Sequence, residues 1–485
     1  MPSKNLRAFK NFTYNTMYRI FAIIVPLVTT PYLTRRIGAS GLGLYGYVYS
    51  VAMYYNLFIK LGLNNYGNRE IARVRQDKDK LSSTFSEIYV FQFLCGVVVS
   101  LVYLFYSLYI SELRSLSLIL ILYVISSGLD ITWFFWGMED FKSTVLRDFI
   151  VKILSTIAIF VFVKTHDDTW KYALILSASF LVSQLILWPN VKRYIKLVKP
   201  SAKGVIKHIA PNFILFIPSI AVSFYKIMDK IMLGKLSTIE EVGYYESCEK
   251  ILAVPLSVVE SLGTVMQPRV SNLVAKNTDK KTINEITYKS ITLMVFLTSV
   301  IGFGIMSVAD EFVPLFYGKG FDACILLFKA IIPSCLFLSF TNVFKTQNLL
   351  PYNKDKQYIV ALFTGAVINV VTNALLIPRL DSVGAGIGTT FAEMGVCVVI
   401  ILFVCREISM KKILFQVSPF VISGVAMYIL GQQINIDVSG ALVNILIKIV
   451  ICGAVYFVTL LMLLIIETKV FKFNWREYAK SVLQF

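Results

Sequence analysis

Long apolar segments follow one another along the whole of this 485-residue chain, and they restrict its possible folds more than any other feature. A helix needs about 20 predominantly apolar residues to cross the hydrocarbon core of a bilayer. The sequence therefore predicts an all-α polytopic membrane protein with about fourteen transmembrane helices. The expected spans are 12–34, 42–62, 84–109, 116–137, 143–164, 170–190, 209–233, 242–266, 286–308, 324–348, 358–377, 384–405, 416–432 and 441–467.

The composition agrees with this class of protein. Hydrophobic residues make up 56% of the chain and charged residues only 16%, whereas soluble proteins average about 45–50% and about 25%. The polar stretches reach about 20 residues at most, which is too short for a separate soluble domain. The chain has two histidines, and its seven cysteines lie in or beside apolar runs without a C-x-x-C pair. We therefore expect buried free thiols and no metal site.

The distribution of lysine and arginine predicts the orientation. If the N-terminus is cytoplasmic and the spans alternate, the inside segments hold 30 of these residues and the outside loops hold 8. Cytoplasmic loops of membrane proteins carry this excess, so both termini are predicted to be cytoplasmic. The net charge of +18 is then an orientation signal that also attracts anionic lipid heads. It is not taken as a sign of nucleic-acid binding.

An internal repeat has an offset of 200 residues. The triplets GLY at 43–45 and GYY at 243–245 each follow an outer turn, and each begins 26 residues before an arginine, Arg69 or Arg269. We therefore expect two six-helix lobes in a pseudo-twofold arrangement, followed by two extra helices. The predicted domains are an N-terminal lobe at 1–200, a C-terminal lobe at 201–415, and the last two helices with a cytoplasmic tail at 416–485.

Two motifs imitate enzyme sites. GLGLYG at 41–46 matches G-x-G-x-x-G, but spanning helices flank it in place of the strand and helix of a dinucleotide fold. Asp77 and Asp79 lie in a short basic loop with no room for a nucleotide fold. The chain has no P-loop, and no outside loop exceeds about 15 residues, so little room is left for a catalytic domain. The sequence predicts no cofactor and no enzymatic activity.

Ionisable residues inside spans are costly and usually face a cavity or a partner. Asp130 and Lys152 flank the hairpin between the fourth and fifth spans at similar depths, and we expect them to form an ion pair. Glu393 lies mid-span, across a hairpin from Asn369 and Asn373. It is either a neutral, hydrogen-bonded carboxyl group or a coupling site for H⁺ or Na⁺.

The first span and the pair formed by the seventh and eighth spans carry further charges. Arg19 lies about two turns into the first span; it either binds a phosphate from the cytoplasmic side or snorkels to the inner surface. The other charges share helix faces at i, i+3, i+4 spacing. They are Lys226, Asp229, Lys230, Glu246, Glu249 and Lys250.

This cluster has two readings. It is either an outer-leaflet ion-pair latch between two helices or part of a substrate path, and an alternating-access transporter can combine the two. Lys226 and Glu249 reach similar depths and are expected to pair. Asp229 and Lys230 are expected near the outer surface, where they either snorkel or contribute to the substrate cavity with the rest of the cluster.

Three segments carry a family resemblance: DKIMLGKLSTIEEVGYYESCEKI at 229–251, TTPYLTRRIGASGLGLYGYVYSV at 29–51, and GLNNYGNREIARVR at 62–75. They resemble the Wzx-type oligosaccharide flippases, which are polysaccharide biosynthesis transporters. The superfamily to which these flippases belong also contains the multidrug and toxin extruders and the lipid II flippases. In span number and two-lobe plan, the resemblance covers essentially the whole chain.

The resemblance implies a transporter that flips undecaprenyl-pyrophosphate-linked oligosaccharide repeat units. They would move from the inner to the outer leaflet of the bacterial cytoplasmic membrane by alternating access, for capsule, O-antigen or another surface polymer. It also implies a cation-lined cavity, with Arg19 as the counterpart of first-helix arginines in lipid II flippases. Polymerase and glycosyltransferase partners are implied as well.

Other functions stay open at this stage. A multidrug or cation exporter of the same fold usually has twelve helices and an acidic cavity, so the two extra spans and the in-span cations argue against it. A lipid II flippase is a close variant. A membrane polymerase or glycosyltransferase is disfavoured because the chain lacks large loops and a credible catalytic motif.

Overall fold

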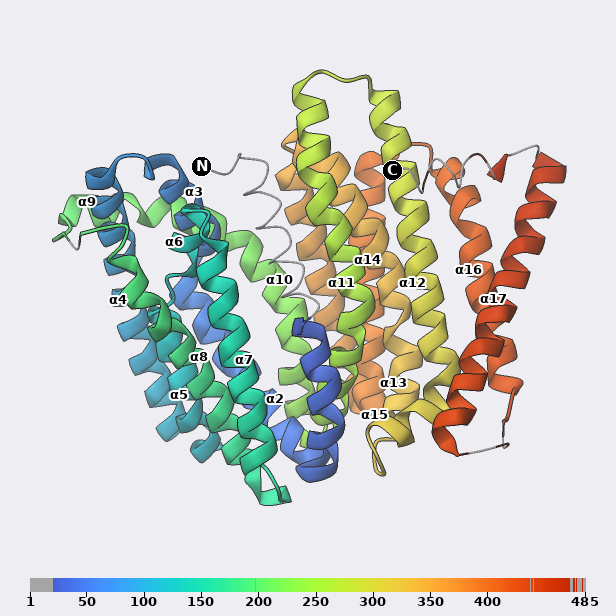
Figure 1. The fold of residues 1–485 in the computed structure, drawn as a ribbon, viewed down its shortest axis with the longest axis horizontal. Coiled ribbons are helices and arrows are strands. Elements are labelled where there is room, and N and C mark those ends of the chain that lie inside the picture. Colours follow the sequence, from blue (N-terminus) through green and yellow to red (C-terminus); the bar gives the residue numbers. More distant parts are fainter. Residues whose placement is uncertain are drawn as a thin grey trace. The chain divides into compact units, whose positions relative to one another are not determined.

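The computed structural model describes residues 21–196, 198–436, 438, 440–471, 474, 475, 477 and 482; the side chains of 218, 224–226 and 471 lie outside this description. Among the described residues, every regular element is a helix (Figure 1). The chain divides into two compact units, Met1–Glu246 and Ser247–Phe485. The sequence predicts a lobe boundary at 200. In the structure, residues 201–246 belong to unit 1, so the helix at 209–236 lies in the first unit and not in the second.

Unit 1 holds the helices that carry most of the predicted charged residues. A helix covers 21–36 and ends near Gly38, whose φ of 68° suits glycine. The elements that follow are α2 (Gly38–Lys60), α3 (Leu63–Val74), α4 (Lys78–Tyr109), α5 (Arg114–Gly128), α6 (Thr132–Gly137), α7 (Phe141–Phe162), η1 (His166–Asp168), α8 (Thr169–Val191), α9 (Ala202–Lys207), α10 (Ile209–Leu236) and the start of α11 (Ile239–Ala275).

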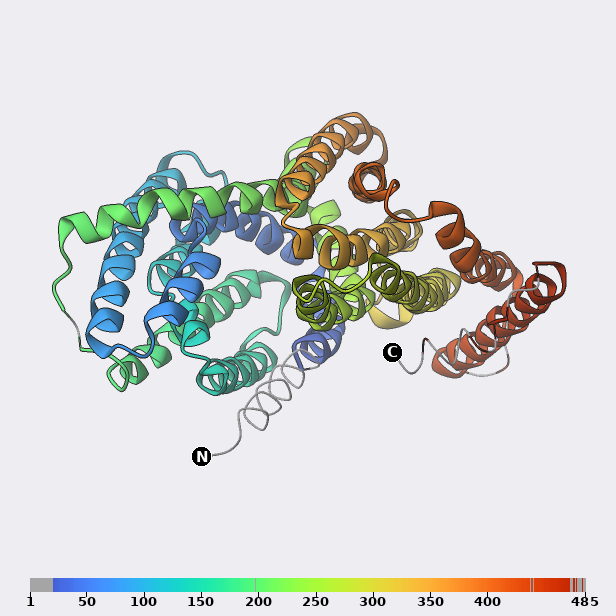
Figure 2. The ribbon, with the colours of Figure 1, turned by 90° about the horizontal axis from the view of Figure 1, so that it is seen from above.

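Unit 2 is built around α12, which packs against α14, α16 and α17. Figure 2 shows the helices of each unit from one end. The elements are α12 (Lys280–Phe316), α13 (Ala323–Ile331), α14 (Pro333–Phe344), η2 (Lys345–Leu349), η3 (Leu350–Tyr352), α15 (Asp355–Val404), α16 (Met410–Gln433) and α17 (Ala441–Phe471). The long α15 contains two legs, because Asp381 breaks it with φ 52° and ψ −132°.

The expected spans fall on helical segments throughout, the first being described from residue 21 onward. Nine helices among the described residues are long and apolar enough to cross a membrane, and α15 supplies two legs. The structure is thus that of a polytopic helical membrane protein. The total of fourteen spans, two of them beyond a two-lobe plan, stays a prediction.

Two helix breaks fall on or beside predicted spans: one lies at the predicted end of the second span, and the other interrupts the fourth span. The first break, at Leu61, separates α2 from α3, and the second, at 129–131, separates α5 from α6. The short segments α3 and α6 pack together at one end of unit 1, near α9 (Figure 1). Gly67 permits this packing, because a Cβ atom there would lie 2.6 Å from the ring of Trp133.

Two glycines of the internal repeat meet in unit 1. A Cβ atom on Gly43 would lie 1.8 Å from the carbonyl oxygen of Ile239, and one on Gly243 would lie 2.0 Å from that of Ala39. Both pairs differ by the repeat offset, since 243 − 43 and 239 − 39 are each 200. The contact is therefore reciprocal, as a twofold-related contact must be. Only glycine allows the two backbones to approach this closely.

Candidate functional site

Two of the predicted site residues, Arg19 and Lys226, lie wholly or partly outside the described part of the chain. Arg19 precedes the described residues, and the side chain of Lys226 on α10 is outside the description. Glu249 and Lys250 are half-buried on α11, in the part that belongs to unit 2. The pairing of Lys226 with Glu249 therefore stays a prediction, and so does a phosphate contact by Arg19.

An ion pair joins the two helix breaks of unit 1. Lys60 is the last residue of α2, and its Nζ lies 2.6 Å from Oδ2 of Asp130, between α5 and α6. Oδ1 of Asp130 accepts a hydrogen bond of 2.9 Å from the backbone N–H of Thr132. The Asp130 side chain is 8% exposed and that of Lys60 is 25% exposed. The lysine is therefore the more accessible member of a largely buried pair.

The broken backbone beside this pair is satisfied by side chains. The amide nitrogen of Gln92 on α4 donates to the carbonyl oxygens of Ser127 and Asp130, each at 2.8 Å. The indole N–H of Trp133 donates to the amide oxygen of Gln92 at 2.9 Å. A break inside hydrocarbon is tolerated only where such groups replace the missing helical bonds. The break is thus a built feature of the helix packing.

A second buried cation lies nearby on α7. The guanidinium of Arg147 contacts Asp148 at 2.8 Å, the amide oxygen of Gln184 at 3.2 Å and the hydroxyl of Thr132 at 3.4 Å. Its side chain is 5% exposed. Through Thr132 and Gln184, Arg147 connects α7 to α6 and α8. It therefore stabilises the packing of the three helices next to the break between α5 and α6.

The expected ion pair between Asp130 and Lys152 is wrong for the described structure, in which Asp130 pairs with Lys60. Lys152 instead donates a 3.3 Å hydrogen bond to the carbonyl oxygen of Ala22 in the first helix. Pro26, four residues after Ala22, has no N–H, so that carbonyl lacks its helical donor. Lys152 supplies the bond that the proline removes. Counting depths along the hairpin of the fourth and fifth spans could not reveal Ala22 as the partner of Lys152, because Ala22 lies in the first helix.

The α10 and α11 helices are joined by two short contacts. Nζ of Lys230 lies 2.6 Å from Oε2 of Glu246, and the hydroxyl of Tyr245 donates to Oδ2 of Asp229 at 2.6 Å. Asp229 is buried and the Lys230 side chain is 12% exposed, so neither snorkels as expected. Glu246 packs against Gly46 of α2, where an added Cβ atom would lie 3.5 Å from Oε2 of Glu246. An ion pair thus links these helices one turn away from Lys226.

A polar row runs along one face of α2 between the two ion pairs. It consists of Tyr45, Tyr49, Asn56 and Lys60, spaced i, i+4, i+11 and i+15, and is called the α2 row. Tyr49 packs on Tyr123 of α5 with ring centroids 5.0 Å apart, and the Asn56 amide donates to the Tyr123 hydroxyl at 2.6 Å. The row brings hydroxyl, amide and ammonium groups to one side of a predicted membrane span.

Glu393 occupies a buried position in unit 2. It is 3% exposed, and Asn369 and Asn373 on the preceding leg of α15 are fully buried. The amide nitrogen of Asn373 donates to the amide oxygen of Asn369 at 3.3 Å. Asn369 and Glu393 each lie twelve residues from the break at Asp381, so they reach the same depth. Burial agrees with the expectation, while the choice between a structural and a coupling role stays a prediction.

Sequence reasoning missed Lys60 and Arg147 as site residues. Arg147 lies in the cytoplasmic segment 138–148 and counts there only as an orientation charge, while Lys60 lies at the end of an apolar span and enters neither count. The helical spacing from Tyr45 to Lys60 was a usable signal. A further pair, Lys448 with Glu311 at 2.5 Å in unit 2, was also missed. No cluster of metal-ligating side chains occurs in the part of the chain that the structure describes.

Comparison with known proteins places the chain in a family. The sequence profile of a family described as "Polysaccharide biosynthesis protein" matches residues 8–274, more than half of the chain. The chain belongs to the polysaccharide biosynthesis protein family. This confirms the resemblance seen in the sequence, and the protein is a member of a transporter family, not an enzyme family.

Several curated proteins resemble this polysaccharide biosynthesis protein. It is 24% identical over 410 residues to a "Putative O-antigen transporter" of Escherichia coli (strain K12), which covers 83% of this chain and 98% of the relative. A protein of the same description from Shigella dysenteriae is 20% identical over 79% of this chain and 96% of its own length. The "Probable low-salt glycan biosynthesis flippase Agl15" of Haloferax volcanii is 25% identical over 43% of each chain.

Two solved structures show which fold the family member shares. The lipid II flippase MurJ in an inward closed conformation matches with a TM-score of 0.67 at 14% identity, over 92% of this chain and 97% of that one. An inward-facing multidrug resistance MATE family transporter of the MOP superfamily matches with a TM-score of 0.62 at 14% identity, over 80% and 99%. At this identity the likeness establishes the fold alone.

Proposed function

We propose that this protein moves undecaprenyl-pyrophosphate-linked oligosaccharide repeat units from the inner to the outer leaflet of the bacterial cytoplasmic membrane. The observation that carries the proposal is the α2 row, which sets polar groups along a span predicted to lie in hydrocarbon. A glycan cannot cross hydrocarbon unaided, because each unsatisfied polar group costs several kcal/mol. Hydroxyl and amide groups like those of Tyr49 and Asn56, which are both partly exposed, replace the water that the sugars give up.

The pyrophosphate requires a cation along the same path. Lys60 ends the α2 row, and its side chain is three times as exposed as that of its partner Asp130, 25% against 8%. Charge-assisted hydrogen bonds to phosphate are among the strongest that a lysine can form, so a phosphate can compete with Asp130 for Lys60. Near the other end of the row, Lys230 of α10 pairs with Glu246, which packs against Gly46 of α2. An inside-negative potential favours outward movement of the anion by about 2.3 kcal/mol per charge per 100 mV.

The relatives support this class of substrate, since two of them are described as O-antigen transporters and one as a glycan biosynthesis flippase. Alternating access between two lobes is proposed from the shared fold. A coupling ion, H⁺ or Na⁺, with Glu393 as its candidate site, is part of the same proposal. So are both termini in the cytoplasm and partnership with a polymerase and glycosyltransferases.

A pair of double variants tests the role of Lys60. K60M/D130N removes both charges of the pair in unit 1, and K448M/E311Q does the same to the buried pair in unit 2. Removing both partners of a buried pair is much less destabilising than removing one, so both proteins are expected in the membrane at near-normal amounts. In a strain that lacks the native protein, we expect K60M/D130N to abolish surface polysaccharide and K448M/E311Q to support it.

Normal polymer export by K60M/D130N would remove Lys60 from the substrate path. The class of substrate is tested separately with purified protein in proteoliposomes. Labelled undecaprenyl-pyrophosphate oligosaccharide is expected to reach the opposite leaflet, and lipid II is not. Transport of lipid II alone would support the peptidoglycan variant, and drug efflux without lipid movement would support the multidrug reading.

A further inference from the structure

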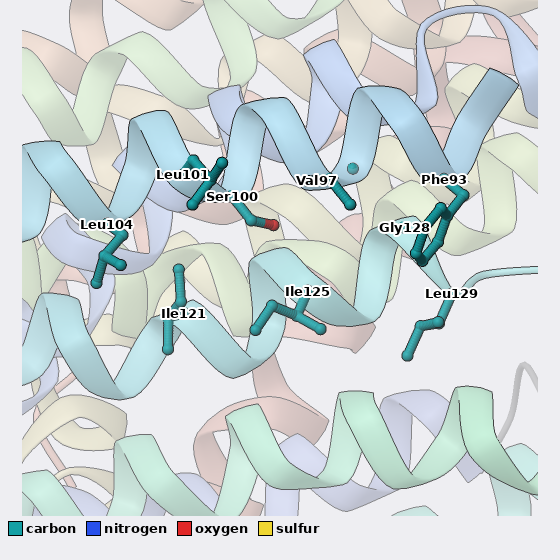
Figure 3. A pocket seen from close by; sticks show the side chains of 10 residues that line it. Phe93, Val97, Ser100, Leu101, Leu104, Ile121, Ile125, Gly128 and Leu129 are labelled. Carbon is teal, nitrogen blue, oxygen red and sulfur yellow. The ribbon is translucent and has the colours of Figure 1, made fainter. Parts of the chain in front are cut away.

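A shallow apolar groove runs between α4 and α5 on the surface of unit 1 (Figure 3). It encloses about 270 Å³. Ser100 contributes the only polar side chain of its lining. The apolar wall comes from one face of each helix, at i, i+4 spacing. Its main members are Phe93, Val97, Leu101 and Leu104 on α4, and Ile121 and Ile125 on α5.

The groove lies along the surface where the two closely packed helices meet. At one end Gly96 and Gly128 touch, since a Cβ atom on Gly96 would lie 2.9 Å from Cα of Gly128. Near the turn at the other end, the hydroxyls of Ser111 and Ser117 lie 2.7 Å apart. Most of the groove lining lies on α4 and α5 between these two contacts.

The surroundings of the groove are those of bilayer hydrocarbon. Its wall is strongly exposed, with Leu101 at 61%, on helices that the sequence predicts to span the membrane. Apolar cavities do not hold water, so a hydrocarbon chain is the natural occupant. The α4 wall from Phe93 to Leu104 is about 16 Å long at 1.5 Å per residue. This matches the roughly 15 Å depth of one leaflet.

A cation stands in line with the groove at its outer end. Arg114 is the first residue of α5, and it lies seven residues, about 10 Å, before Ile121 on the same helix face. It is exposed and forms no hydrogen bond or ion pair with any residue in the described part of the chain. The positive-inside pattern places this end of α5 at the outer surface. An anionic group at that surface would therefore find a cation above an apolar slot.

We infer that this groove binds one acyl chain of an outer-leaflet phospholipid, with its phosphate at Arg114. The chain follows the face of Ile121 and Ile125 down to Gly128. Gly128 and Leu129 immediately precede Asp130, so the bound lipid packs against the helix break that holds the Lys60 ion pair. The lipid is a structural ligand of unit 1, and this inference does not depend on which substrate is transported.

Retained phospholipid, counted by mass spectrometry after detergent purification and extensive washing, tests the inference. V97W fills the groove, whereas V98W places the same bulk on an exposed α4 position outside its lining. R114Q removes the cation, and K319Q removes an exposed cation from a predicted outer turn of unit 2. We expect V97W to lose one bound phospholipid, and V98W and K319Q to keep it. R114Q is expected to retain it about fivefold less well, as fits the loss of one cation near lipid head groups.

Equal phospholipid content in V97W and the wild type would overturn the inference, as would an equal loss in V98W. Loss of a polyisoprenoid lipid in place of a phospholipid would overturn the choice of occupant. Because V97W can disturb packing, R114Q provides an independent measure, since its side chain is exposed and contacts no described partner. Unchanged retention in R114Q would remove the head-group contact from the proposal.

Discussion

At the residue scale, two buried or half-buried lysines of unit 1 have carboxylate partners outside their own helix. Lys60 pairs with Asp130 from another helix, and Lys230 pairs with Glu246 across a turn. Lys152 is different, because its described partner is a backbone carbonyl. Removing one member of a buried ion pair costs about 3–5 kcal/mol, so these residues cannot vary singly without loss of stability. These charged residues are therefore needed for helix packing, whatever their role in transport.

Lys152 offers a sharp test at this scale. K152M leaves the Ala22 carbonyl without a donor, and an unsatisfied buried group of this kind costs about 1–3 kcal/mol. We expect a lower melting temperature and several-fold less surface polysaccharide, because the first helix is no longer fixed at Pro26. P26A restores the missing N–H, so the double variant K152M/P26A should recover both stability and export. The measurements are thermal unfolding of the purified protein and polymer export in cells.

The double variant also separates two roles for Lys152. Stability that recovers without export would show that the ammonium group serves the substrate in addition to the helix. If neither recovers, the bond to Ala22 is not what the lysine contributes. P26A alone is the control, and it should leave unfolding within about 1 kcal/mol of the wild type, as for a compatible proline replacement.

The sequence predicted the depth of a residue in the membrane better than it predicted the partner of that residue. Glu393 and its asparagines could be placed at one depth from the sequence, because a hairpin relates its two legs by simple counting. The same counting paired Asp130 with Lys152 and was wrong, since Asp130 has a neighbour on α2 as well as on its own hairpin. Depth is encoded locally, whereas the choice among partners at one depth depends on how non-adjacent helices pack.

At the element scale, the expected spans correspond to helices, but their interruptions were not foreseen. Hydropathy averages over about 19 residues, so a short break such as 129–131 inside the fourth span is invisible to it. The end of α2 at Lys60, however, lies within two residues of the predicted end of the second span. The internal repeat, in contrast, marks the residues at which α2 and α11 contact each other. The glycines that mark it, Gly43 and Gly243, are the ones that cross each other.

This crossing leads to a prediction about glycine. G43A and G243A each place a Cβ atom within about 2 Å of a backbone carbonyl oxygen. Backbone cannot give way as a side chain does, so each variant should be destabilised by at least the roughly 1–3 kcal/mol of ordinary overpacking. G453A on α17 is the matched control, because nothing lies within 4 Å of its added methyl group. Melting temperatures should fall for the first two variants and stay level or rise slightly for the third.

If G43A melts at the temperature of the wild type, the helices do not cross as closely as described. If only one of the two repeat variants is destabilised, the contact is not reciprocal.

At the scale of the whole molecule, the family and the fold follow from the sequence, while the path of the substrate does not. The distribution of basic residues, the apolar spans and the signature segments are properties of the chain itself. The helical spacing of the α2 row is visible in the sequence, but the polar partners of Asn56 on α5 and of Lys60 at the second break are not. Orientation in the membrane is a further whole-molecule property, and the charge distribution alone predicts it.

Single cysteines test this orientation and the number of spans together. Among the described residues Cys405 is the only fully exposed native thiol, so a C405S background leaves little accessible sulfur. K319C and N435C lie in predicted outer turns, and K199C lies in the basic connector predicted to be inside. A membrane-impermeant maleimide should label K319C and N435C in intact cells, but should label K199C only after permeabilisation. The charge bias of 30 to 8 is the physical reason. Labelling of K199C in intact cells would show that the orientation is the opposite of the predicted one. Protection of N435C would show that the segment at 416–432 does not cross the membrane.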